Sequence, residues 1–354
     1  HFPGDPSDLG NWHPSATFKD LSLQAANGIP GFKAISGTIM PLKSGEGFRV
    51  NLDSSKSTLS FPGIFRHPNM EFDTLKVTAD IVAHPTFTVR LPSFEASNAG
   101  AALKGSGSWT ATGGPGTLEL NGTISRAKAT AVPAYIPLVV GDGVLDWLEA
   151  AILDGSGSNG TFIVQGPLEH FPWDGEYKNN GHFAIEADVT NGRLDFLPSH
   201  VKKSDGQWET GAYWPVLHNI NAHLAFIGNG FEIRGRSANS NDLRASDVIV
   251  SMKSYSDANL EIQGRARGDL SRVLRYLNQG KMLNDVLASA FAQSKGSGAA
   301  DVLMNLHIPL SGDIAKNLRV NIDADIRNGT FHYGLNLPTV TGINGKLKIT
   351  EKSV

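Results

Sequence analysis

The chain has 354 residues, of which 18% are charged, and a formal net charge of −3. This balance gives no electrostatic reason to expect nucleic acid as a partner. The sequence contains no cysteine, which excludes a disulfide framework and a thiolate metal site.

Residues 30–130 show apolar and polar side chains in alternation, which is typical of half-buried β-strands. Leu75, Val77, Ala79 and Ile81 are a clear example. The glycine-rich clusters at 105–107 and 113–116 predict turns between such strands. No apolar run along the chain approaches the length of a membrane-spanning helix.

Two stretches with helical periodicity interrupt the strands. The first, residues 142–153, starts at Asp142, which is suited to a helix N-cap; the second spans 269–293. Each is followed by a Gly/Ser-rich stretch, 155–160 and 296–298, which predicts a turn leading into the next strand.

A strand-and-turn pattern then recurs. Apolar residues alternate from Phe183 to Val189 and again from Val320 to Ile326, and Asn191-Gly192 and Asn328-Gly329 follow as hairpin-turn signals. The spacing Pro-x4-Ile-x3-Leu occurs at 215/220/224 and at 338/343/347. We therefore predict an internally repetitive chain with three modules: a β-meander over 1–130, a helix plus meander over 131–268, and a second, truncated one over 269–354.

Catalytic and metal-binding motifs are weak in this sequence. Residues 155–160 fit GxGxxG, but they follow a predicted helix and precede a strand, the reverse of a dinucleotide site, so we interpret them as a turn. His218 and His223 fall on opposite faces of a strand, so we expect no metal, and we expect no cofactor. The alternation places five carboxylates on a solvated face: Glu186, Asp188, Asp195, Glu232 and Glu261. An enzyme acting on polysaccharide remains a rival interpretation, but we expect no enzymatic activity.

The apolar phase of the strands admits two interpretations. One is a closed core filled by its own side chains, as in a β-sandwich; the other is a curled sheet that forms an open trough for an apolar guest. The candidate lipid-binding residues share this phase: Leu118, Leu120, Phe162, Val164, Phe183, Ile185, Leu224, Phe226, Phe231, Ile233, Leu260, Ile262, Leu306, Ile308, Val320 and Ile322.

Several segments resemble a known family. They are 135–137 with 147–155, 160–168 with 171–173, and 181–183, 191–194 and 214–215 with the meander that follows. In these the chain is similar to the periplasmic part of the YhdP-type proteins, within the AsmA-like group.

This resemblance implies an all-β-dominated fold, an elongated, curled antiparallel sheet with a few short helices that forms a repeat-built hydrophobic groove. It implies non-enzymatic carriage of phospholipid between the inner and outer membranes of a Gram-negative envelope, with acyl chains on the groove and no nucleic acid as partner. The chain begins as if within a longer protein, so the family's inner-membrane anchor helix, and the contacts with both membranes, are expected outside it. The alternative function is a structural or interaction scaffold of the envelope with a self-filled β core. Protein partners are not indicated.

Overall fold

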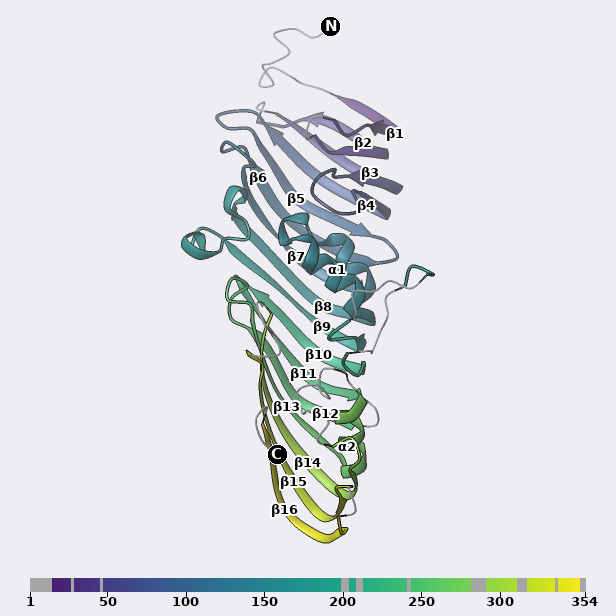
Figure 1. The fold of residues 1–354 in the computed structure, drawn as a ribbon. Coiled ribbons are helices and arrows are strands. Elements are labelled where there is room, and N and C mark those ends of the chain that lie inside the picture. The colour runs from purple at the N-terminus through teal and green to yellow at the C-terminus, as the bar shows by residue number, and fades with distance from the viewer. Residues whose placement is uncertain are drawn as a thin grey trace. The chain divides into compact units, whose positions relative to one another are not determined.

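The computed structural model describes residues 15–26, 29–44, 47–198, 204–207, 213–240, 243–279, 281, 291–310, 317–334 and 337–350. These residues form a sheet whose strands follow one another in sequence order, from β1 at one edge to β16 at the other (Figure 1). The strand pairs with a defined register are all antiparallel. The all-β, antiparallel fold class predicted from the sequence is therefore confirmed.

The strands span β1 Ala16–Leu23, β2 Gly31–Pro41, β3 Phe48–Ser60, β4 Asn69–Val82, β5 Thr88–Ser97, β6 Ala101–Thr110, β7 Thr117–Lys128, β8 Ile152–Pro167, β9 His182–Leu194, β10 Leu217–Ile227, β11 Gly230–Ser240, β12 Leu243–Met252, β13 Asn259–Asp269, β14 Lys295–Pro309, β15 Arg319–His332 and β16 Val340–Thr350. The α-helices are α1, Asp142–Ala151, and α2, Leu270–Gln279. Short 3-10 helices cover Ala129–Tyr135, Leu138–Val140, Leu168–His170 and Gly175–Tyr177.

The chain divides into two compact units. Unit 1 comprises residues 1–145, 157–187 and 226–229, and unit 2 comprises 146–156, 188–225 and 230–354. The three modules predicted from the repeats divide the chain on a different basis, and they remain a prediction.

Both helices arise where the sequence predicted them. α1 begins at Asp142, an acidic residue in the first turn, where it complements the positive end of the helix dipole. α2 places Leu270, Val273, Leu274 and Leu277 on one buried face. The remainder of the predicted helix 269–293, including Leu283 and Leu287, lies largely outside the described residues.

The glycine-rich turn predictions were partly wrong. Residues 113–116 do form a turn between β6 and β7, but 105–107 lie inside β6, 155–160 inside β8 and 296–298 inside β14. The reason is steric. An added Cβ at Gly105 would collide with the backbone carbonyl of Asn121 and the ring of Phe94, so glycine permits a close approach within the sheet.

The two Asn-Gly hairpin predictions were also wrong. β9 and β15 continue through Asn191-Gly192 and Asn328-Gly329. Asn191 and Asn328 have φ of 52° and 48°, and the register of β15 with β16 shifts between Ile326 and Gly329. Asparagine tolerates the left-handed region, and here it forms an irregularity inside a long strand, of the kind that increases local twist.

Candidate binding face

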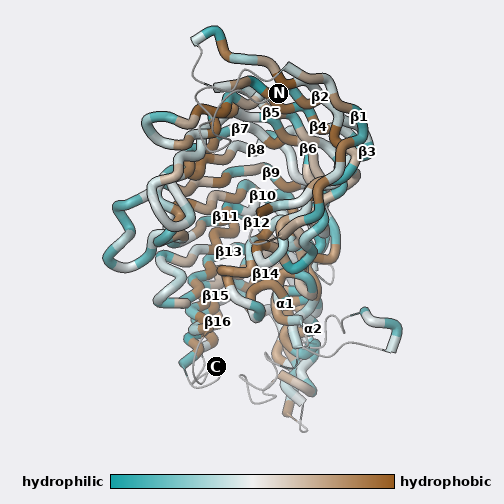
Figure 2. Tube along the Cα trace, turned by 90° about the horizontal axis from the view of Figure 1, so that it is seen from above, coloured by the Kyte–Doolittle hydropathy of each residue, from teal (hydrophilic) through white to brown (hydrophobic). Residues whose placement is uncertain are grey.

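One face of the unit 1 sheet is lined by apolar side chains aligned across strands. Leu118 on β7 lies opposite Trp109, Trp109 opposite Val89, and Val89 opposite Ile81. Most side chains of this row and the next are half-buried. We call this set the unit 1 face: Leu52, Val77, Ile81, Val89, Leu91, Phe94, Leu103, Trp109, Leu118 and Leu120. The alternation of apolar and polar residues along the strands can be followed in Figure 2.

A bulge in β5 keeps this face continuous. Leu91 pairs with Gly107 and Phe94 with Gly105, so three steps along β5 match two along β6. Strict alternation would have turned Leu91 and Phe94 to opposite sides. The extra residue at Pro92-Ser93 instead returns both to the apolar side.

Seven predicted binding residues lie in unit 1. Leu118 and Leu120 lie on the unit 1 face. The ring of Phe162 on β8 covers Gly122 and lies 6.4 Å from the ring of Phe94, which places it on the same side. Phe183 on β9 stands edge-to-face with Phe171 at 6.0 Å. The remaining three, Val164, Ile185 and Phe226, are half-buried on β8, β9 and β10.

Nine predicted residues lie in unit 2, and six of these are deeply buried. Ile262 lies opposite Leu306, and Leu306 opposite Val320, while Leu260 lies opposite Ile308. The six are Leu260, Ile262, Leu306, Ile308, Val320 and Ile322, with exposed fractions of 3–8%. Phe231 packs against the same cluster and Ile233 lies opposite Val250; Leu224 is half-buried on β10. The register therefore aligns the predicted residues of β11, β13, β14 and β15 in this unit.

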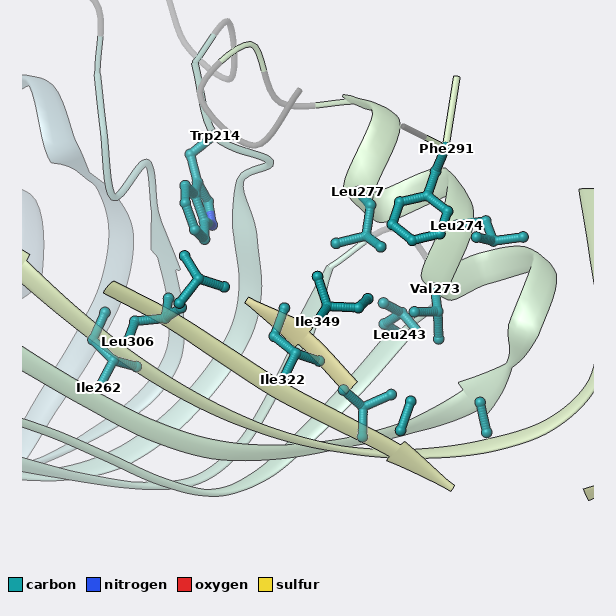
Figure 3. Close-up of a cluster of buried hydrophobic side chains, with 14 of the residues drawn as sticks. Trp214, Leu243, Ile262, Val273, Leu274, Leu277, Phe291, Leu306, Ile322 and Ile349 are labelled. Carbon is teal, nitrogen blue, oxygen red and sulfur yellow. The ribbon is translucent and has the colours of Figure 1, made fainter. Parts of the chain in front are cut away.

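In unit 2 the chain covers this apolar face itself. Figure 3 shows Ile262, Leu306 and Ile322 rising from the strands toward the side occupied by Trp214 and the residues of α2. Trp214 is only 6% exposed, and its indole Nε1–H donates a 2.8 Å hydrogen bond to the hydroxyl oxygen of Tyr276 on α2. Burial raises the pKa of Tyr276 to about 12, and the bond from Trp214 offsets part of that rise. Here the apolar face is a packed core.

The opposite face carries paired charges in each unit. In unit 1, Arg49 lies opposite Asp80 and makes two hydrogen bonds to it, of 2.6 and 2.7 Å, which lower the pKa of Asp80. In unit 2, Arg265 binds both oxygens of Asp301 at 2.6 and 2.7 Å, and with Arg267 it lowers the pKa of Asp301. A face of paired, partly solvated charges is suited to water.

Of the five carboxylates predicted on a solvated face, two are well exposed, Glu186 and Asp188 are half-buried, and one is buried. Glu232 and Glu261 have side chains 42% and 46% exposed, and they pair with Arg234 and His307. Asp195 is fully buried, so its placement on a solvated face was wrong; it follows directly after β9, where the strand period no longer sets its direction.

Other residues of the unit 1 face were not predicted from the sequence. Val89, Leu91 and Trp109 line it in unit 1, and the alternation that selected Leu118 and Leu120 is present in their strands. The packing of Trp214 and α2 over the unit 2 face could not be predicted, because Trp214 and its partner Tyr276 lie 62 positions apart in sequence.

Among the described residues, no group of three or more His, Asp or Glu side chains gathers in a way that could hold a metal ion. Within the same part of the chain, no helix has both the length and the apolar character needed to cross a membrane.

One protein family matches almost the whole chain. The family described as "YhdP protein" matches residues 3–354. The chain belongs to the YhdP family. A curated relative, the "Intermembrane phospholipid transporter YhdP" of Escherichia coli (strain K12), is 24% identical over 217 residues, which cover 61% of this chain and 15% of the relative. The chain thus spans a small part of that YhdP protein's length. No solved structure matches the chain.

Proposed function

We propose that this chain forms part of a non-enzymatic conduit that carries phospholipid along an apolar β-sheet face between inner and outer membranes. The observation that carries the proposal is the unit 1 face, an aligned set of apolar side chains that are only partly buried by the chain. The membership of the chain in the YhdP family, and the printed name of its relative, make phospholipid the guest to test first.

The physical argument concerns the two ends of a lipid. Each acyl methylene that leaves water stabilises the complex by about 0.8 kcal/mol when fully buried. A half-exposed apolar row offers such burial, and without a guest it would favour aggregation. Residues of the unit 1 face such as Leu120, Leu91 and Val77 are chemically alike. An acyl chain on this face, which we also call the floor, therefore meets no single strong site and can slide.

The setting is proposed from the same relative. An intermembrane transporter of a Gram-negative envelope works in the periplasm, so we place the chain there, with an inner-membrane anchor and the membrane contacts supplied by other parts of the protein. The proposed guest contacts are the predicted residues of unit 1. For the six buried residues of unit 2, contact with lipid requires the cover formed by Trp214 and α2 to move.

A photo-crosslinking amino acid at two adjacent positions tests the proposal. Leu120 and Glu119 follow one another on β7 and point to opposite faces; Leu120 lies opposite Gly107 and Glu119 opposite Ser108. We expect phospholipid adducts from position 120 and few from position 119. Equal labelling, or none at either position, would show that the unit 1 face does not hold lipid.

A scaffold with a self-filled core is the second candidate, and the unit 2 cluster favours it there. The same pair of probes at Leu306 and Asn305 separates the two functions. Adducts at position 306 would show that the cover moves and that lipid reaches unit 2, whereas labelling confined to unit 1 would limit the conduit to that unit.

A further inference from the structure

Antiparallel strands in sequence order place alternate turns on the same rim of the sheet. In unit 1 one rim carries the β4–β5 turn (83–87), the β6–β7 turn (111–116) and the β8–β9 loop (168–181). The other rim carries the β3–β4 turn (61–68) and the β5–β6 turn (98–100). The two rims differ in what their side chains do.

Aromatic rings lie in or beside the three turns of the first rim named above. Phe87 stands edge-to-face with Trp109 at 6.2 Å, and Phe171 with Phe183 at 6.0 Å. Phe87 is 36% exposed, and Trp109, Phe171 and Phe183 are half-buried. We call these four residues the aromatic rim. Trp109 belongs also to the unit 1 face, so the rim begins where the apolar floor ends.

Hydrogen bonds of two tryptophan side chains hold the turns of this rim in place. Trp109 donates its indole N–H to the carbonyl oxygen of Pro115 at 2.9 Å, within the β6–β7 turn. The β8–β9 loop has a similar bond: the indole N–H of Trp173, which is 2% exposed, donates to the carbonyl oxygen of Pro167 at 2.7 Å, and the Trp173 ring stands edge-to-face with Phe171 at 5.1 Å. The backbone N–H of Leu168 also donates to the carbonyl oxygen of Gly116, which joins the two turns. A tryptophan ring whose N–H is already hydrogen-bonded, as in Trp109, suits a boundary between hydrocarbon and water.

The second rim is occupied by the chain. The segment Ala129–Val140 runs along its turns: Tyr135 exchanges hydrogen bonds with Asn98, and Leu138 donates its backbone N–H to Ile64. Arg66 then pairs with Asp142 at 3.2 Å, where α1 begins. A headgroup that left the floor on this side would meet this segment.

Given the proposed function, on which this inference rests, we propose that the aromatic rim holds the glycerol and ester region of the bound phospholipid. The headgroup then enters water across Phe87, Trp109, Phe171 and Phe183, and the acyl chains run over the floor toward the rim covered by Ala129–Val140. Tryptophan takes the same level in membranes, where one end of the ring is apolar and the other is wet, and the phenylalanines extend the apolar side of this boundary.

Photoreactive phospholipids test this orientation on the full 354-residue chain. Two phosphatidylcholine probes carry one diazirine each, placed either beside the ester or at the end of an acyl chain, and adducts are mapped by peptide mass spectrometry. We expect the ester probe to label peptides with Trp109 and Phe171, and the chain-end probe to label those with Val77 and Leu103. The same peptides from both probes, or the reverse pattern, would overturn the orientation while leaving lipid binding intact. Labelling by neither probe would overturn the proposed function and this inference with it.

Ring-removing variants give a second readout. Trp109→Leu and Phe171→Leu keep an apolar side chain but lose the ring, and each should weaken probe binding by about two- to tenfold. Phe61→Leu is the matched control, since Phe61 also has an edge-to-face partner, Phe65 at 5.9 Å, but lies on the covered rim. Thermal unfolding followed by circular dichroism shows that each variant is folded at the assay temperature. Equal loss in all three variants would show that the rings only hold their turns together, which overturns the proposal.

Discussion

A carboxylate introduced on the apolar face should impair folding in unit 2 but only lipid binding in unit 1. Leu118 and Leu306 occupy equivalent phases of their strands, with apolar partners across the sheet: Trp109 for Leu118, Ile262 and Val320 for Leu306. Leu306 is 3% exposed, while Leu118 is half-buried. We predict that Leu306→Asp unfolds or strongly destabilises the chain, and that Leu118→Asp leaves it folded but unable to bind phospholipid.

The magnitudes follow from burial. Loss of a fully buried leucine costs about 1.5–3 kcal/mol, and burying a polar group without a partner costs about 1–3 kcal/mol more, so Leu306→Asp should cost about 2.5–6 kcal/mol. That is a large part of the stability of an ordinary domain, about 5–15 kcal/mol. At position 118 the carboxylate stays hydrated when no lipid is bound, so we expect a loss of about 1 kcal/mol or less.

Urea unfolding measures the loss of stability in both variants. Displacement of a fluorescent phospholipid measures whether the Leu118→Asp variant still binds lipid. Glu119→Ala is the matched control for Leu118→Asp, because it changes the neighbouring residue on the polar face. If Leu118→Asp destabilises the chain as much as Leu306→Asp does, the unit 1 face is an ordinary core. If it folds and still binds lipid normally, the guest lies elsewhere.

Three further predictions concern the cover and the floor. Leu274→Ala on α2 should lower the free energy of unfolding by about 2–5 kcal/mol, whereas the exposed Gln279→Ala should change it little; urea titration compares them. Burial raises the pKa of Tyr276 from 10.0 to about 12, so its stabilising effect should be complete below pH 10 and fall as the pH rises toward 12, by up to about 3 kcal/mol. A Tyr276→Phe variant whose alkaline unfolding profile matched that of the original chain would disprove this. Gly105→Val should cost about 1–3 kcal/mol through overpacking, while Gly345→Val, with open space around its Cβ position, should cost much less; similar melting temperatures would contradict the close approach at Gly105.

Much of the fold could be predicted from the sequence because apolar residues at every second position are typical of a β-strand with one buried face. Leu118 with Leu120, Leu260 with Ile262, and Val320 with Ile322 each fell on a strand with the predicted phase, and the register aligned the last two pairs with Leu306. The helices that begin at Asp142 and Leu270 were predictable because their apolar residues recur with the helical period of about 3.6 residues.

Strand ends and depth of burial were not predictable in this way. Asn191-Gly192 permits either a hairpin or an irregularity inside a strand, and only the neighbouring strands decide between them. Equal alternation also gave no sign that Leu118 would be half-exposed and Leu306 buried. That difference depends on Trp214 and Tyr276, which come from distant parts of the sequence to cover unit 2.

The central claim is that the unit 1 face holds phospholipid, and native mass spectrometry of the chain purified from a lipid-containing envelope tests it most directly. The account predicts a mass increment of at least one phospholipid on the original chain and on Glu119→Ala, and its loss from folded Leu118→Asp. A chain that carries no lipid under conditions in which it remains folded, or a lipid increment that Leu118→Asp leaves unchanged, would contradict the account.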